Sequence, residues 1–142
     1  MAIGLDTNVL TRYFVAPGEN AAERRQHEAA KRLIDSGRPL KVVKTVLLEL
    51  EWVLRGFYDY RRGEIGKVLA WLVAQPHIEI EDRAAVRQAL ANHADGLDFS
   101  DALHHAGYAD CESVASFDDR GFARRSGKLG MQPPIKLPAS IG

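Results

Sequence analysis

The chain has 142 residues, 46% of them hydrophobic and 27% charged, and its formal net charge is zero. This length predicts a single domain over residues 1–142, with a core that needs no disulfide or metal to hold it. The only cysteine, Cys111, excludes an intramolecular disulfide and favours a reducing, cytoplasmic location, where we expect it to be partly buried. We expect neither a signal peptide nor a membrane helix.

The charges are distributed unevenly along this neutral chain. Residues 79–119 hold ten acids and two bases, whereas residues 120–142 hold five bases and no acid. Residues 24–62 hold ten bases and five acids. An acidic centre between basic segments suits a metal site beside a phosphate-binding rim, although ordinary solvated faces give the same pattern.

Short apolar runs alternate with longer stretches of helical periodicity. The pattern predicts strands at 2–5, 40–43, 77–80, 113–117 and 134–137. It predicts helices at 20–36, 46–58, 64–74, 82–93, 100–108 and 120–126. Thr45 and Ser100 are the expected N-caps of two of these helices. Alternating strands and helices indicate an α/β domain with a mostly parallel sheet, in which functional groups gather beyond the carboxyl ends of the strands.

Three aspartates stand where that rule places functional groups. Asp6 and Asp118 directly follow predicted strands, and Asp101 falls in the first turn of a predicted helix. Converging carboxylates are the hard oxygen ligands that Mg²⁺ and Mn²⁺ prefer. Each aspartate alone also fits a turn, a helix cap or the helix dipole, so the argument depends on their occurring together.

Glu49 is the fourth candidate, and Glu51 is its nearby alternative. Glu51 precedes Arg55 by four residues, which predicts an ion pair on a solvent-exposed helix face. Glu49 is therefore expected on a half-buried face, where a carboxylate needs a partner or a metal. The alternative is that Glu49 is merely exposed.

Several neighbouring residues could support such a site. Asp98 could bind the metal through water, or could simply cap the turn before Asp101. Thr7 and Asn8 could hydrogen-bond the carboxylate of Asp6, or could be ordinary helix-start residues. Candidate contacts to an RNA backbone include Arg12, Arg120 and Arg124, each of which could equally be a solvated surface residue.

Four segments resemble, in the same order, the motifs of PIN-domain proteins. They are 5–10 (LDTNVL), 46–54 (VLLELEWVL), 97–103 (LDFSDAL) and 116–118 (SFD). Ser100 stands where alanine is usual, and Ser116, a further supporting residue, stands where threonine is commoner. The similarity is greatest to the VapC toxin subgroup.

The resemblance implies a three-layer α/β/α sandwich with a mostly parallel sheet of about five strands. It also implies a Mg²⁺- or Mn²⁺-dependent endoribonuclease in which Asp6, Glu49, Asp101 and Asp118 hold the metal and a metal-activated water attacks the phosphodiester. The implied partners are RNA, a second copy in a homodimer, a small VapB-type antitoxin and, through that antitoxin, promoter DNA. The alternatives are an RNA-processing nuclease without an antitoxin and a catalytically silent interaction module.

Overall fold

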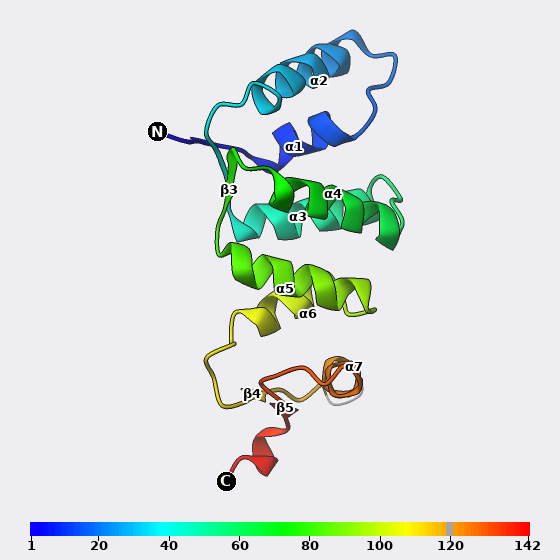
Figure 1. Ribbon diagram of the computed structural model, residues 1–142. Helices are drawn as coiled ribbons and strands as arrows, with labels where there is room; N and C mark the ends of the chain where they lie inside the picture. The colour runs from blue at the N-terminus through cyan, green and yellow to red at the C-terminus, as the bar shows by residue number, and fades with distance from the viewer. Residues whose placement is uncertain (119–120) are drawn as a thin grey trace. The chain divides into compact units, whose positions relative to one another are not determined.

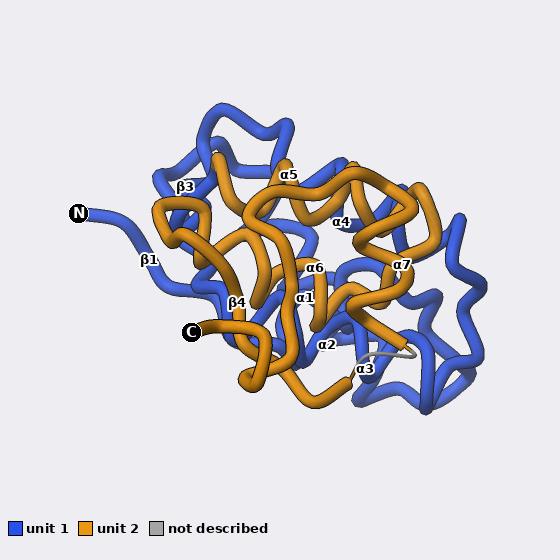
Figure 2. Tube along the Cα trace, turned by 90° about the horizontal axis from the view of Figure 1, so that it is seen from below, with its two compact units in different colours: residues 1–83 blue, residues 84–142 orange. Residues whose placement is uncertain are grey.

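The computed structural model describes residues 1–118 and 121–142. The chain divides into two compact units, residues 1–83 (unit 1) and 84–142 (unit 2), which Figure 2 colours separately. Helices and strands alternate along the chain (Figure 1), and every strand in the described residues pairs in parallel. The predicted α/β class is thereby confirmed.

Unit 1 holds three strands and four helices in its described residues. They are β1 (Ile3–Gly4), α1 (Thr7–Phe14), α2 (Ala21–Ile34), β2 (Leu40–Val42), α3 (Lys44–Gly56), α4 (Arg62–Ala74) and β3 (Ile78–Ile80). The predicted elements agree to within a few residues, with one exception. Helix α1, which Asp6 caps, was not among the predicted helices.

The sheet of unit 1 has the order β1-β2-β3. In its register Ile3 pairs with Leu40 and Leu40 with Ile78. Leu40, Val42, Ile78 and Ile80 are buried, whereas the alternate positions Lys41 and Glu79 are exposed and form an ion pair of 3.2 Å across the two strands. This alternation fixes the register, because a shift of one residue would expose the apolar side chains.

Helix α3 begins without the predicted Thr45 cap. The helix starts at Lys44, and its N-cap residue, Val43, makes no side-chain capping bond. A residue distant in sequence supplies the acceptor instead, because the backbone N–H of Lys44 donates to Oε1 of Glu81 over 2.8 Å. The hydrogen bond from Lys44 to Glu81 thus replaces a local cap. Residue spacing near the start of the helix does not indicate such a distant partner.

The core of unit 1 is built from leucines and isoleucines on the inner faces of its helices. The fully buried members include Leu10, Leu47, Leu50, Leu54, Ile65 and Leu69. At the far end of the unit, the Arg83 guanidinium donates to the carbonyls of Val73 and Ile78. This double contact ties the end of α4 to the start of β3.

Unit 2 contains α5 (Arg83–Ala94, all but its first residue), α6 (Phe99–Ala106), β4 (Val114–Ala115), α7 (Phe122–Lys128), β5 (Ile135–Lys136) and the 3-10 turn η1 (Pro138–Ser140). Strands β4 and β5 form a two-stranded parallel sheet. The ring of His93 packs edge-on against the buried Phe99, with centroids 5.9 Å apart. The buried His105 hydrogen-bonds the carbonyl of Pro133 through Nε2 over 2.7 Å, which anchors the segment before β5.

Two further expectations, on membrane helices and on the burial of Cys111, can be compared with the structure. No helix in residues 1–118 and 121–142 is long and apolar enough to cross a membrane. Cys111, expected to be partly buried, is exposed in a turn after α6, so the expectation about its burial was wrong.

Candidate functional site

Asp6 is fixed at the point where the first strand gives way to a helix. The residue follows β1 directly and is the N-cap of α1, where its Oδ1 accepts a hydrogen bond of 2.8 Å from the backbone N–H of Thr7. The cap orients the carboxylate while leaving the side chain exposed. Capping and a functional role are therefore compatible at this position, because one oxygen is enough for the cap.

The predicted environments of Glu49 and Glu51 are reversed in the structure. The ion pair of Glu51 with Arg55 exists, at 2.9 Å from Nε to Oε1, but Glu51 is only 6% exposed. The Arg55 side chain extends outward and remains half exposed. Glu49, expected on a half-buried face, is exposed. The prediction erred because an i,i+4 pair need not lie in solvent when a long arginine carries the charge to the surface.

Asp6 and Glu49 nevertheless line one pocket. This pocket, which we call the acidic pocket, has a volume of about 270 Å³. Its lining is Asp6, Thr7, Asn8, Thr11, Arg12, Glu49, Val53 and Tyr58. Helices α1 and α3 contact each other, and this packing brings the end of β1 beside the middle of α3. Two carboxylates distant in sequence thus face the same space.

Thr7, one of the residues that line this pocket, has a buried hydroxyl. Thr7 is buried, and its Oγ1 has no hydrogen-bond partner among the described residues. The neighbouring Thr11 hydroxyl instead donates to the carbonyl of Thr7 over 2.9 Å. A buried hydroxyl without a partner is costly, so position 7 carries a polar atom that packing alone does not explain. Thr7 touches Asp6 through its backbone rather than through the predicted side-chain bond.

Unit 2 holds the other predicted acids, beginning with Asp98 and Asp101 on α6. Asp98, not the predicted Ser100, is the N-cap of this helix, and its Oδ2 accepts from the N–H of Asp101 over 3.2 Å. Asp101 lies in the first turn, as predicted. Burial raises the pKa of the Asp101 carboxyl, and the negative charges of Asp98 and Asp118 raise it further. A cation beside these acids would relieve that repulsion.

Asp118 is held by the turn that leads into α7. Its Oδ1 accepts from the N–H of Gly121 over 2.9 Å, while the hydroxyl of Ser116 accepts from the N–H of Asp118 over 3.1 Å. Ser116 therefore contacts Asp118 through the backbone N–H of Asp118. A Cβ atom on Gly121 would lie 3.0 Å from both carboxylate oxygens of Asp118, so only glycine allows this approach without a shift.

The donor chemistry of both units fits a hard divalent cation. Carboxylates of Asp6 and Glu49 face the acidic pocket with the Thr7 hydroxyl beside them, and such oxygen ligands suit Mg²⁺ or Mn²⁺. Among the described residues, neither unit by itself gathers three or more His, Cys, Asp or Glu side chains closely enough to hold a metal ion. Protein carboxylates that hold Mg²⁺ are commonly few, because the ion keeps several waters.

The predicted RNA-contacting arginines have different surroundings. Arg12 lines the acidic pocket, and its Nε donates to Oε1 of Gln26 on α2 over 2.7 Å. Arg124 is exposed on α7, whereas Arg120 lies outside the described residues. Arg125, the residue after Arg124, lowers the pKa of Asp101. Positive charge therefore lies near the acids of unit 2.

Tyr58 also lines the acidic pocket and was not among the predicted site residues. It follows α3, which ends at Gly56. The glycine at the end of an apolar helix was a signal that the helical spacing stops there.

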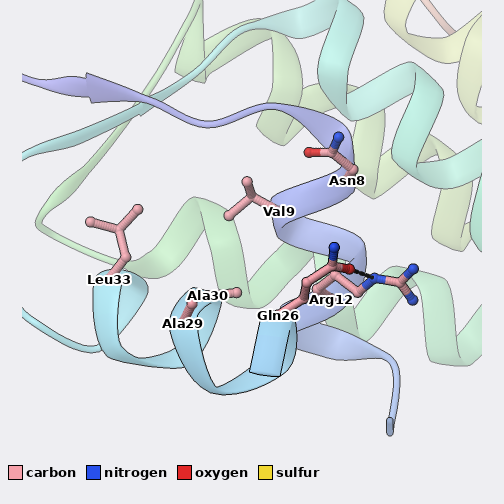
Figure 3. Close-up of a pocket in the computed structure, with 7 residues that line it drawn as sticks. All are labelled: Asn8, Val9, Arg12, Gln26, Ala29, Ala30 and Leu33. Atoms are coloured by element: carbon pink, nitrogen blue, oxygen red, sulfur yellow. Dashed lines mark hydrogen bonds between the residues drawn. The ribbon is translucent and has the colours of Figure 1, made fainter. Parts of the chain in front are cut away.

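A second pocket lies between α1 and α2 and shares Asn8 and Arg12 with the acidic pocket (Figure 3). Its volume is about 460 Å³, and its lining is Asn8, Val9, Arg12, Gln26, Ala29, Ala30 and Leu33. Small and branched apolar side chains of α2 face Val9 of α1 across this groove.

Comparison with known families gives a match to the PIN domain over residues 3–128. The match spans nearly the whole chain and runs through both units, so the chain belongs to the PIN domain family. Members of this family are generally nucleases that use divalent metal ions. Comparison with curated proteins gives no match.

Proposed function

We propose that the protein is a Mg²⁺- or Mn²⁺-dependent endoribonuclease that hydrolyses RNA phosphodiesters. The acids that we propose as metal ligands are those predicted from the sequence, Asp6 and Glu49 in unit 1, and Asp101 and Asp118 in unit 2. The observation that carries the proposal is that Asp6 and Glu49 line one pocket. The family match supports the same chemistry.

The divalent ion, when bound, lowers the pKa of a water and stabilises charge on the phosphoryl group. The chain's own residues then have separate tasks. The cap at Asp6 holds its carboxylate toward the pocket, and Glu49 orients the attacking water or accepts its proton. Arg12, held by Gln26, offers its guanidinium to a backbone phosphate at the pocket rim.

The cleavage test uses purified protein, Mg²⁺ or Mn²⁺ and total cellular RNA. We expect Asp6→Asn and Glu49→Gln to lower the cleavage rate by at least about 100-fold, because each removes a charged ligand. Matched controls are Glu28→Gln in unit 1 and Glu112→Gln in unit 2, both exposed acids outside the acidic pocket. Equal cleavage by all variants, or no cleavage by the wild type with either metal, would refute the proposal.

We also propose that this nuclease is the VapC-type toxin of a type II toxin–antitoxin pair. The support is the apolar groove between α1 and α2, which suits apolar side chains of a small antitoxin (Figure 3). On this proposal the toxin is a homodimer, and the complex reaches promoter DNA only through the antitoxin. Induced expression should arrest growth, and co-expression of a neighbouring small reading frame with an antitoxin-like sequence should relieve it. A nuclease that leaves growth unaffected fits RNA processing instead.

A further inference from the structure

An exposed aromatic pair directly follows α3, in the segment that leads to α4. Phe57 is 77% exposed, and its ring packs edge-on against Tyr58 with the centroids 4.8 Å apart. Tyr58 in turn lines the acidic pocket together with Asp6 and Glu49. The pair therefore forms an apolar shelf that continues from the rim of that pocket.

Backbone hydrogen bonds hold this shelf in place. The N–H groups of Phe57 and Tyr58 both donate to the carbonyl of Val53, over 2.9 and 3.3 Å, and the N–H of Tyr60 donates to the carbonyl of Leu54 over 2.9 Å. Asp59 adopts a left-handed conformation with φ of 56°, which turns the chain tightly after the pair. The rings are thus presented by a folded turn rather than by an unsupported loop.

The surroundings of the pair favour a ligand with a flat apolar part joined to an anionic part. An aromatic ring left in water beside a polar pocket forgoes the stabilisation that burial gives, which makes such a surface a candidate for binding. The guanidinium of Arg12 in the same pocket supplies a positive charge for a phosphate. Unpaired nucleobases stack on aromatic side chains, and their phosphates follow neighbouring cations.

We propose that Tyr58 and Phe57 form a stacking subsite for an unpaired nucleobase of single-stranded RNA. The base on this shelf is the neighbour of the phosphodiester that enters the acidic pocket. This inference rests on the proposed nuclease function and deepens it, since it assigns a base-binding subsite beside the acidic pocket. It also assigns a specificity role to two residues that hold no metal.

A binding measurement without cleavage tests the subsite. The probe is a short single-stranded RNA with one 2-aminopurine, whose fluorescence falls when the base stacks, titrated at low salt with EDTA. Tyr58→Leu and Phe57→Leu should each weaken binding by about 5- to 100-fold and diminish the fluorescence change. Tyr58→Phe should bind like the wild type, because it keeps the ring.

Trp52→Leu is the matched control. Trp52 is 63% exposed on the same helix and, in the described residues, is not part of the acidic pocket lining. We expect this variant to bind RNA normally. Loss of binding in Trp52→Leu equal to that in Tyr58→Leu would overturn the subsite and point to a general apolar surface for a protein partner. Circular dichroism checks that each variant is folded, and Phe57→Leu carries the test if Tyr58→Leu unfolds.

RNA substitutions provide a second, independent test on the wild-type protein. Replacing one base by an abasic ribose should weaken wild-type binding as much as Tyr58→Leu does, and the two changes together should add little more. A perfect RNA duplex should bind without sensitivity to Tyr58→Leu. Full additivity, equal sensitivity of the duplex, or no measurable binding by the wild type would each overturn the proposal.

The two proposals fail in different ways. If the wild type cleaves RNA but Tyr58→Leu binds and cleaves normally, the stacking subsite is wrong and the nuclease stands. If stacking-dependent binding is found but Asp6→Asn cleaves as fast as the wild type, the subsite stands and the proposed catalytic acids are wrong.

Discussion

The carboxylate of Glu51 accepts two hydrogen bonds from the guanidinium of Arg55, one turn further along α3, at 2.9 Å from Nε and 3.4 Å from Nη2. Glu51 is buried at this position, whereas Glu49, two residues before it, is exposed and faces the acidic pocket. Two glutamates of one helix therefore have separable roles, one in stability and one in the proposed chemistry.

The first prediction concerns this pair of glutamates. Glu51→Gln should lower the free energy of unfolding by about 1–2 kcal/mol, because a charge-assisted pair at a buried carboxylate is weakened. The remaining folded protein should cleave RNA at a rate close to that of the wild type. Glu49→Gln should show the opposite result, with unchanged stability and little cleavage. Urea unfolding followed by fluorescence, paired with cleavage rates, separates the two. Stable but inactive Glu51→Gln would contradict the assignment.

The second prediction concerns Asp101. Burial and the charges of Asp98 and Asp118 raise its pKa, so its contribution to stability is present below the usual carboxyl pKa and is lost as the pH rises through the folded value. In EDTA at pH 7, Asp101→Asn should therefore have a higher Tm than the wild type. The difference should vanish near pH 3, where the wild-type carboxyl is protonated.

Mg²⁺ provides the control for that measurement. Adding Mg²⁺ at pH 7 should raise the Tm of the wild type, because a ligand that binds only the folded state stabilises it, and should raise that of Asp101→Asn less. An equal rise in both proteins would show that Asp101 does not hold the ion.

The third prediction concerns Gly121, which allows the close approach of the Asp118 carboxylate. Gly121→Ala should displace that carboxylate by a few tenths of an ångström or more, since the added Cβ would lie 3.0 Å from both oxygens. We expect a loss of cleavage of roughly 10-fold or more with a normal circular dichroism spectrum, because positioning errors of this size are costly. Gly127→Ala is the matched control, because nothing in the described residues lies within 4 Å of its added Cβ. Normal activity in Gly121→Ala would remove Asp118 from the catalytic set.

The fourth prediction concerns the contact of Tyr13 with Asp35, which joins α1 to the end of α2. The Tyr13 hydroxyl donates to Oδ1 of Asp35 over 2.7 Å. Burial, this hydrogen bond and the negative charge of Asp35 raise the pKa of Tyr13 to about 12. The contact therefore contributes stability below pH 10, and the contribution is lost as the pH rises through about 12.

Absorbance at 295 nm follows this titration directly. Tyr13→Phe should remove the tyrosine that ionises near pH 12 and should lower the free energy of unfolding at pH 7 by about 1 kcal/mol, the value of one hydrogen bond. If the high-pH step persists in Tyr13→Phe, another tyrosine carries it. Tyr108→Phe, an exposed tyrosine in unit 2, is the control and should leave that step unchanged.

Sequence periodicity predicted most elements, because alternating runs and apolar stripes follow directly from strand and helix geometry. It missed α1, whose eight residues carry few strong helix formers and begin at a cap that also reads as a turn. The caps at Thr45 and Ser100 were wrong for different reasons. At the start of α3, Glu81 accepts the hydrogen bond from the N–H of Lys44 that a local cap would have accepted. At the start of α6, Asp98, two positions before Ser100, is an equally suitable capping residue.

The candidate site was predicted in part. The rule that functional groups follow strand ends led to Asp6, and the structure places that residue and Glu49 in one pocket. The argument that chose Glu49 over Glu51 relied on exposure and had the two environments reversed. Tyr58 was not predicted as a pocket residue, because the helix was predicted to continue to residue 58, whereas α3 ends at Gly56. Catalytic roles for the four acids stay predictions for the cleavage test.

The unpartnered hydroxyl of Thr7 has a consequence for protein engineering. Valine has nearly the same shape as threonine without the buried oxygen, so Thr7→Val should make the protein more heat-resistant by removing a desolvated polar atom. A chain selected for robustness alone would have valine there. If thermal resistance rises while turnover falls, position 7 is a site where natural selection has accepted a less durable protein in exchange for a working one.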